Sequence, residues 1–171
     1  MPGGPLRVLA AEREVTRLGE GVFRSGRIED QAMDFLCAQL TRMSQVIAKH
    51  DVLALRAVAT AAVRDANNQN EFIARASAAL GAPIEVISGQ EEARLIHLGV
   101  TLKWPQTKGR VLLVDLGGGS GEITLSEDDR LQESFSKPVG AVRLTEVFLK
   151  SNDPAAAEIG KYLRDEGVKL R

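Results

Sequence analysis

The stretch Val111-Leu112-Leu113-Val114-Asp115-Leu116-Gly117-Gly118-Gly119-Ser120 decides the fold of this chain. Its first half is a run of aliphatic residues, which predicts a strand buried on both faces. The three glycines predict a tight turn, and residues 122–126 are expected to return as a partner strand. Asp115 stands at the carboxyl end of the first strand, where open α/β sheets place their ligands.

Outward from this stretch, predicted strands alternate with predicted helices. Extended segments are expected over residues 6–10, 12–18, 52–59, 84–87 and 132–136, and helices over 28–50, 68–81, 88–104, 144–148 and 153–169. The segment 52–59 has the composition of a strand buried on both faces. A Pro-Gln-Thr-Lys-Gly cluster at residues 105–109 is the clearest break in the pattern. The alternation predicts an α/β fold in two lobes.

Composition limits the kinds of partner. The 171 residues carry 22 Lys and Arg against 23 Asp and Glu, a formal net charge of -1, so no global basic field draws the protein to nucleic acid or to anionic membrane. One cysteine, Cys37, cannot form an internal disulfide, and no apolar run reaches the length of a membrane span. We therefore expect a cytoplasmic protein that binds any anion through local chemistry.

The glycine-rich turn is a candidate anion site. Three consecutive glycines let backbone N–H groups approach an anion without obstruction by a Cβ atom. A carboxylate at Asp115 beside such a loop suits a divalent cation or a water between the two. Glu122, just beyond the loop, is a candidate to orient a water or to hold a metal. The alternatives are a simple hairpin turn with an exposed Asp115, and a solvent-exposed strand residue at Glu122.

Two glutamates at the start of the predicted helix 88–104 have different explanations. Ser88 as N-cap and Glu91 at the third helical position fit a capping box, as do Asn68 and Glu71 at the start of the predicted helix 68–81. Glu92 has no such structural role and becomes a candidate base if the glycine loop lies nearby; otherwise it is a solvated first-turn residue. Arg64, after the segment 52–59, is a candidate phosphate clamp. Its alternative is a surface ion pair with a nearby acidic residue, either Asp65 or Glu71.

These stretches resemble, in order and spacing, the family of exopolyphosphatases and guanosine pentaphosphate phosphohydrolases. The matching segments are Arg13–Gly21, Ala57–Asn67, Ile84–Ile96, Val114–Glu122 and Pro138–Thr145. The resemblance covers roughly residues 6 to 150, and five ordered matches are more specific than one glycine loop. It implies an actin-like, ribonuclease H-like α/β fold of the ATPase type, with the active site between two lobes.

The resemblance also implies an activity and site residues. The activity is magnesium-assisted hydrolysis that releases terminal inorganic phosphate from polyphosphate or from guanosine pentaphosphate. Glu92 matches the general base, Asp115 and Glu122 match acidic residues near metal and water, and Arg64 matches a phosphate-contacting arginine. Residues Gly117, Gly118, Gly119 and Ser120 match the second phosphate loop. A homodimer is implied as well. The matched site residues suit phosphoryl transfer, because that reaction depends on positioning and charge neutralisation.

The sequence departs from the family pattern in three places. Family members begin with a strand and an Asp-x-Gly-Ser-Asn phosphate loop, whereas Pro5–Leu9 resembles the segment that comes after that loop. Position 121 is Gly where the family usually has Thr, and the chain ends soon after Arg143. We therefore expect residues 1–104 to form a first lobe without its N-terminal strand and loop, and residues 105–171 to form a partial second lobe. Little activity is expected of this chain.

Two other functions fit parts of the pattern. The first is a non-catalytic regulatory module that binds polyphosphate or nucleotide without turnover. The second is a sugar or acetate kinase of the same wider fold, but such kinases need a nucleotide site in a second lobe, and Glu92 favours a hydrolase that activates water. Nucleic-acid binding has no basic patch or interleaved aromatic residues to support it.

Overall fold

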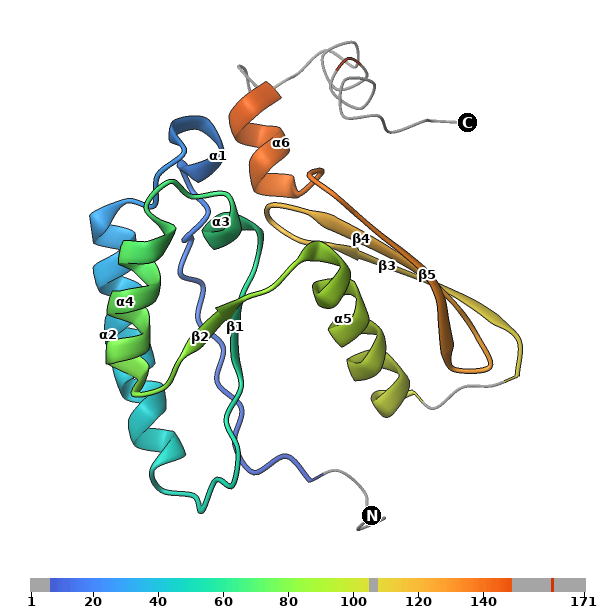
Figure 1. Cartoon of the computed structure of the whole chain (residues 1–171), viewed down its shortest axis with the longest axis horizontal. Coiled ribbons are helices and arrows are strands. Elements are labelled where there is room, and N and C mark those ends of the chain that lie inside the picture. Colours follow the sequence, from blue (N-terminus) through green and yellow to red (C-terminus); the bar gives the residue numbers. More distant parts are fainter. Residues whose placement is uncertain (1–6, 105–107, 149–160, 162–171) are drawn as a thin grey trace.

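The computed structural model describes residues 7–104, 108–148 and 161. Two small sheets and the helices packed on them make up this part of the chain (Figure 1). In order, the elements are α1 (Val22–Ser25), α2 (Asp30–Ile47), β1 (Ala57–Ala59), α3 (Ala61–Arg64), α4 (Gln69–Leu80), β2 (Ile84–Val86), α5 (Gly89–Lys103), β3 (Arg110–Leu116), β4 (Gly121–Glu127), β5 (Arg130–Lys137) and α6 (Ala141–Phe148).

The two sheets differ in topology. Strands β1 and β2 are parallel, with Ala57 opposite Ile84, and α3 and α4 form the crossover that a parallel pair requires. Strands β3, β4 and β5 form an antiparallel meander, with Leu116 opposite Gly121. The glycine-rich stretch is therefore the hairpin loop between β3 and β4.

The core lies between α2, α4 and the parallel pair of strands. Met33 of α2 and Phe72 of α4 are almost fully buried, and Ile28, just before α2, is completely buried. Asn68, the residue before α4, fixes this junction because its side chain accepts a hydrogen bond from Ile28 N (3.0 Å) and donates one to Ile28 O (3.0 Å). This pairing satisfies a buried backbone that has no helix or strand partner there.

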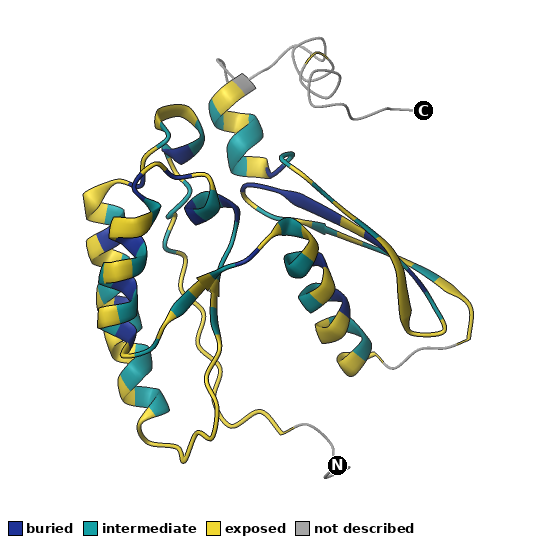
Figure 2. Cartoon of the chain, viewed as in Figure 1, coloured by how far each residue is buried: buried dark blue, intermediate teal, exposed yellow. Residues whose placement is uncertain are grey.

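The three-stranded sheet has an unusual distribution of residues on its two faces. Its inner face, against α5, carries the polar residues Glu122, Thr124 and Ser126, all buried. The aliphatic and aromatic side chains exposed to solvent include Leu112, Val114, Leu116, Ile123 and Phe135. Exposed positions alternate with half-buried ones along β3, whereas β4 is buried or half-buried except at Ile123 (Figure 2).

Several predicted elements are confirmed and others are wrong. The helices over 28–50, 68–81 and 88–104 form, as do the hairpin and the strand over 132–136. Residues 7–16 form no strand, because no described strand lies beside them to complete a ladder. The segment 52–59 is a strand only over Ala57–Ala59, since β2 is three residues long and follows Pro83. The predicted tail helix 153–169 lies outside the described residues apart from residue 161.

Burial on both faces was predicted for two strands and is wrong for both. Leu112, Val114 and Leu116 of β3 are each more than half exposed. Val58 of β1 is exposed as well. In each case one face of the strand has no element packed on it among the described residues. The helices of the same part of the chain include none with the length and apolarity needed to cross a bilayer.

Candidate functional site

The glycine loop, residues 117–120, presents unpaired N–H groups. Its carbonyl oxygens are occupied: Ala141 N donates to Gly117 O (2.9 Å), and Arg143 N donates to Gly118 O (3.0 Å). Within the described part of the chain, the N–H groups of Gly118, Gly119 and Ser120 donate to no acceptor. A run of free, adjacent N–H groups whose carbonyls are held away is the backbone arrangement that binds anions.

Close packing, rather than backbone conformation, explains the glycines of this loop. None of them has a positive φ. A Cβ atom on Gly119 would lie 2.5 Å from the ring of Phe23 and 2.7 Å from the Ala61 Cβ. Gly140, before α6, has its own missing Cβ directed at the backbone of Gly118 and Gly119. The loop is therefore held between α3 on one side and the start of α6 on the other.

Glu92 lies in the first turn of α5, as the sequence predicts. The Ser88 hydroxyl accepts a hydrogen bond from Glu91 N (3.1 Å), which fixes where the helix begins. The Glu92 side chain is 16% exposed, and Arg64 Nη1 lies 3.5 Å from its Oε2. Burial of the carboxyl group, followed by the charge of Glu122, raises the pKa of Glu92 despite the opposing effect of Arg64 and Thr60.

Glu91 confirms only half of the predicted capping box. Its backbone N–H is capped by Ser88, but its carboxylate turns to the surface and bonds Arg94 (2.6 Å) and Arg56 (3.2 Å). The hydrogen bond from Arg94, aided by Arg56, lowers the pKa of Glu91 to about 2. The neighbouring carboxylates of Glu91 and Glu92 thus have pKa values shifted in opposite directions, Glu91 by arginines at the surface and Glu92 by burial. The second predicted box, Asn68 with Glu71, is wrong because Asn68 makes no side-chain cap and bonds Ile28 instead.

Asp115 and Glu122 face each other across the β3–β4 ladder. Glu122 is 1% exposed, and its Oε1 accepts a hydrogen bond from Ser136 (2.8 Å). Its Oε2 is buried without a partner, which is costly for a carboxylate unless a proton, a water or a cation lies beside it. The alternative in which Glu122 is a solvent-exposed strand residue is therefore wrong. Asp115 is half-buried.

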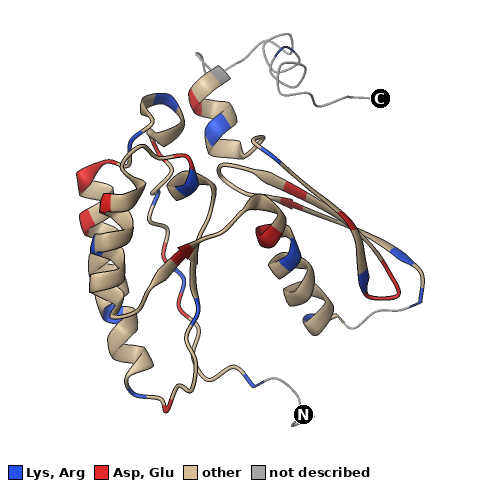
Figure 3. Cartoon of the chain, viewed as in Figure 1, with Lys and Arg blue, Asp and Glu red and all other residues tan. Residues whose placement is uncertain are grey.

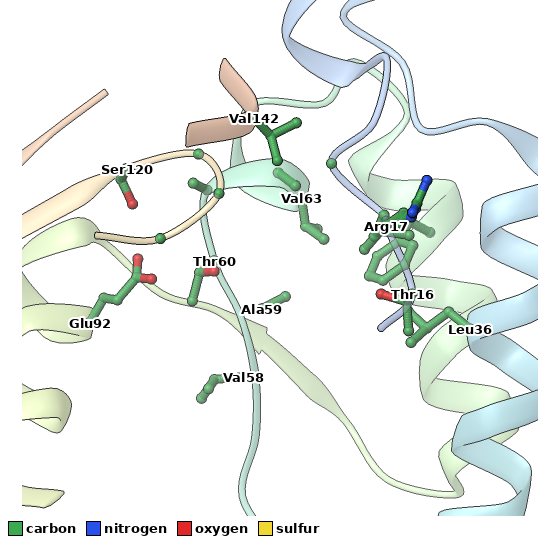
Figure 4. Close-up of a pocket in the computed structure, with 18 of the residues that line it drawn as sticks. Thr16, Arg17, Leu36, Val58, Ala59, Thr60, Val63, Glu92, Ser120 and Val142 are labelled. Atoms are coloured by element: carbon green, nitrogen blue, oxygen red, sulfur yellow. The ribbon is translucent and has the colours of Figure 1, made fainter. Parts of the chain in front are cut away.

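One cavity of about 520 Å³ brings the Glu92 carboxylate and the glycine loop together. In Figure 4 the Glu92 side chain rises beneath the loop that carries Ser120, with Thr60 beside it. Arg64 and Glu122 line no part of this cavity themselves, but Arg64 touches Glu92 and the charge of Glu122 acts on it. The far wall carries the apolar residues Leu18, Leu36 and Leu40 together with Thr16 and Arg17. We call this cavity the Glu92 pocket.

The surface ion pairs suggested for Arg64 do not form. Asp65 pairs with Arg143, and Glu71 pairs with Arg27 and Arg75. Arg64 instead donates to Ile87 O (2.7 Å) and contacts Glu92. Acidic and basic residues are otherwise interspersed along the chain rather than gathered on one element (Figure 3).

Sequence reasoning gave no role to Arg143 or Ser136, two residues that complete the site. Arg143 donates from Nε to Gly119 O (2.8 Å), pairs with Asp65, and stacks 4.1 Å from the Phe23 ring centre. Ser136 holds Glu122, and Thr60 acts on Glu92. The Pro-Val-Gly-Ala-Val-Arg motif that contains Arg143 carried the available signal, since it recurs in the family pattern.

The metal expectation has partial support from the chemistry of the site. Among the described residues no group of three or more His, Cys, Asp or Glu side chains is arranged to hold a metal. Magnesium, however, is usually bound by one or two carboxylates together with phosphate oxygens and water. The unpartnered Oε2 of Glu122, with Asp115 opposite it on the ladder, fits such a partial ligand set.

Fold and pocket together define an α/β protein with a half-buried acidic side chain beneath a glycine-rich loop. The chain belongs to the Ppx/GppA phosphatase family, whose model matches residues 2–168. It is 37% identical over 166 residues to exopolyphosphatase 2 of Mycobacterium tuberculosis, covering 94% of this chain and 52% of that protein. Identity to exopolyphosphatase 1 of Mycobacterium bovis is 31% over 163 residues, covering 95% and 47%.

Solved structures agree with this assignment. A crystal structure of an exopolyphosphatase from Cytophaga hutchinsonii superposes with a TM-score of 0.84 at 28% identity, over 94% of this chain and 52% of that one. A Ppx/GppA family member from Aquifex aeolicus superposes with a TM-score of 0.69 at 32% identity, over 89% and 49%. The expected actin-like α/β fold is confirmed. The chain spans about half the length of the relatives it matches.

Proposed function

We propose that the Glu92 pocket is the site of a phosphohydrolase that releases terminal inorganic phosphate from polyphosphate or from guanosine pentaphosphate. One observation carries the proposal: Glu92 lines the same cavity as Gly118, Gly119 and Ser120, whose N–H groups have no acceptor among the described residues. An anion held by those N–H groups would lie next to a carboxylate able to accept a proton from an attacking water. Membership of a phosphatase family supports the same reaction.

In this proposal the residues of the site divide the work. Glu92 takes the proton of the attacking water, and its raised pKa suits a general base that works near neutral pH. The loop N–H groups neutralise charge on the transferred phosphoryl group, and Arg64, which contacts Glu92 from outside the pocket, adds a nearby positive charge that a phosphate oxygen could reach. Ser136 orients Glu122 through its Oε1, which leaves Oε2 free for water or a cation. Arg143 holds the loop in place through Gly119 O.

Magnesium would be held by Asp115 and Glu122 together with phosphate oxygens. When bound, such an ion would neutralise negative charge that the two carboxylates bring close to the phosphate. Without it, Asp115, Glu122 and Glu92 would repel a polyanion from the loop. We therefore expect polyphosphate binding to this chain to strengthen when magnesium is added.

A binding module without turnover is the second candidate, and the apolar wall of the pocket favours it. On the side opposite the glycine loop, Leu18, Leu36 and Leu40 offer no donors to a phosphate. The described side-chain donors there are limited to Thr16 and to Arg17, which pairs with Glu20. Phosphoryl transfer is fastest when donors surround the transferred group. We accordingly expect this chain to bind polyphosphate and to hydrolyse it slowly.

The test compares two neighbouring carboxylates. Phosphate release from polyphosphate and from guanosine pentaphosphate is measured beside calorimetric binding, for the unaltered chain, Glu92→Gln and Glu91→Gln. Glu91 is the matched control, because it lies on the same turn but bonds surface arginines. We expect Glu92→Gln to reduce release about a hundredfold or more while binding persists, and Glu91→Gln to have no effect. Equal residual release in all three proteins would refute the hydrolase and leave the binding module.

Two coarser features are proposed with the function. We divide the chain into a first lobe at residues 1–104 and a partial second lobe at residues 105–171, and we propose a homodimer. Limited proteolysis should cut near residue 104 if the lobes are separate. Sedimentation equilibrium should give twice the chain mass of 18.4 kDa.

A further inference from the structure

A second cavity, of about 410 Å³, adjoins the Glu92 pocket. It is bounded by the start of α5, the end of β5 and the side chains of Arg64 and Arg143. Ser120 lines both cavities, and Arg64, which lines the second, contacts Glu92, which lines the first. The two cavities are therefore separated by the Arg64–Glu92 ion pair and by Ser120.

The lining of this second pocket is positively charged. It contains three basic residues, Arg64, Lys137 and Arg143, against the single carboxylate of Asp65. Asp65 is already paired with Arg143, and Arg64 with Glu92. The Lys137 ammonium has neither a hydrogen bond nor an ion pair within residues 7–104 and 108–148. A positive charge thus remains in the pocket that no described acidic residue neutralises.

Backbone donors lie in the same pocket. Gly89 and Gln90 are the first two residues of the fifteen-residue helix α5 and both line the cavity. The next two N–H groups are occupied, Glu91 N by Ser88 Oγ and Glu92 N by Ser88 O. Those of Gly89 and Gln90 have no acceptor among the described residues. Free N–H groups at the positive end of a helix, beside a lysine and an arginine, match the oxygens of a tetrahedral anion.

Gly89 lets the start of α5 pack closely against β5 at the edge of this pocket. A Cβ atom there would collide with the Ser136 side chain and would come within 4.0 Å of Arg64 Nη2. Only a residue without a side chain lets the helix start approach β5 while the basic groups remain around the opening.

From this geometry we propose that the second pocket binds an oxyanion of the phosphate class, separately from any group held in the Glu92 pocket. The proposal concerns binding alone and holds whether or not Glu92 supports hydrolysis. The same chemistry serves two sources. One is a free inorganic phosphate ion. The other is an inner phosphate of a chain whose end lies at the glycine loop, on the far side of Ser120.

Amide NMR on the whole chain distinguishes the two pockets. Inorganic phosphate, and separately tripolyphosphate, is titrated into the labelled protein while the signals of Gly89 and Gln90 are followed beside those of Gly118 and Gly119. A shift at Gly89 and Gln90 with inorganic phosphate supports binding of the free ion. A shift there only with tripolyphosphate, together with Gly118 and Gly119, supports the chain. Shifts confined to Gly118 and Gly119, or none in any of the four signals, overturn the proposal.

Two charge variants complete the experiment. Lys137→Gln should weaken the response of the Gly89 and Gln90 signals on the order of tenfold, because it removes one charge-assisted contact. Lys103→Gln removes an equal charge from the other end of α5, away from both pockets, and should leave the response unchanged. Equal effects of the two variants would show only general charge attraction and would overturn the assigned site. Glu92→Gln should retain the response even if it abolishes phosphate release, which separates this proposal from the hydrolase.

Discussion

Replacement of Gly140 by Ala tests how tightly the glycine loop is held. A Cβ atom at Gly140 would lie under 3.0 Å from the carbonyl carbon and oxygen of Gly118 and from the Gly119 nitrogen. These are backbone atoms, so no side-chain rotation relieves the overlap. Ordinary contact begins at 3.4 Å, so the loop or α6 must shift by about 1 Å to relieve the overlap. Overpacking of this kind costs about 1–3 kcal/mol of folding free energy.

The same shift should disturb function. The hydrogen bonds from Ala141 N to Gly117 O and from Arg143 N to Gly118 O hold the loop carbonyls away from the pocket. Moving α6 loosens both and misdirects the free N–H groups, so tripolyphosphate binding should weaken together with stability. Urea unfolding gives the first quantity, with an expected decrease in midpoint of roughly 1 M. Calorimetry gives the second.

Gly99→Ala is the matched control. Gly99 lies within α5, and a Cβ atom there would meet nothing within 4 Å. This variant should be more stable by about 0.5–1 kcal/mol, because Ala loses less backbone entropy than Gly in a helix. If Gly140→Ala raised the midpoint as Gly99→Ala does, the close approach of α6 to the loop would be refuted.

Three further results are expected. Asn68→Ala should lower the free energy of unfolding by about 1–3 kcal/mol, because it leaves the buried N–H and C=O of Ile28 without hydrogen-bond partners. An unchanged urea midpoint would contradict this. Arg94→Ala should raise the pKa of Glu91 from about 2 toward its ordinary value, followed by carboxyl NMR; an unmoved titration would exclude Arg94 as the main cause. Glu92→Gln should raise the melting temperature at pH 7. The raised pKa means that the folded state binds more protons, so ionised Glu92 costs stability as pH rises above 4.5, and the gain should vanish in acid.

Local signals in the sequence predicted the site better than its surroundings. Ser88 caps α5 as predicted, because a cap depends on residues within one helical turn. The same local argument separates Glu91 from Glu92, and the structure gives the two carboxylates correspondingly different environments. The roles of Glu92, Asp115 and Arg64 in catalysis remain predictions.

Tertiary context defeated the other local arguments. Asn68 occupies the predicted N-cap position, but its side chain is taken by Ile28, which is forty residues away in sequence. The aliphatic runs around Val58 and Val114 predicted burial on both faces, because composition reports what a strand can bury and not which neighbours are present. Arg143 could not be recognised from sequence as the residue that holds the glycine loop, since its contacts with Phe23, Asp65 and Gly119 join three distant segments.

The β3-β4-β5 sheet buries polar side chains and exposes apolar ones, which has a practical consequence for handling this protein. Leu112, Val114 and Leu116 are exposed to solvent, whereas Thr124 is buried beneath α5. The sheet therefore presents an apolar surface to water. Concentrated samples should therefore self-associate and bind hydrophobic dyes. Replacing Leu112 and Val114 by Lys or Thr should reduce this self-association with little loss of stability. Thr124→Val raises the β-sheet propensity but should not reduce self-association, because residue 124 is buried.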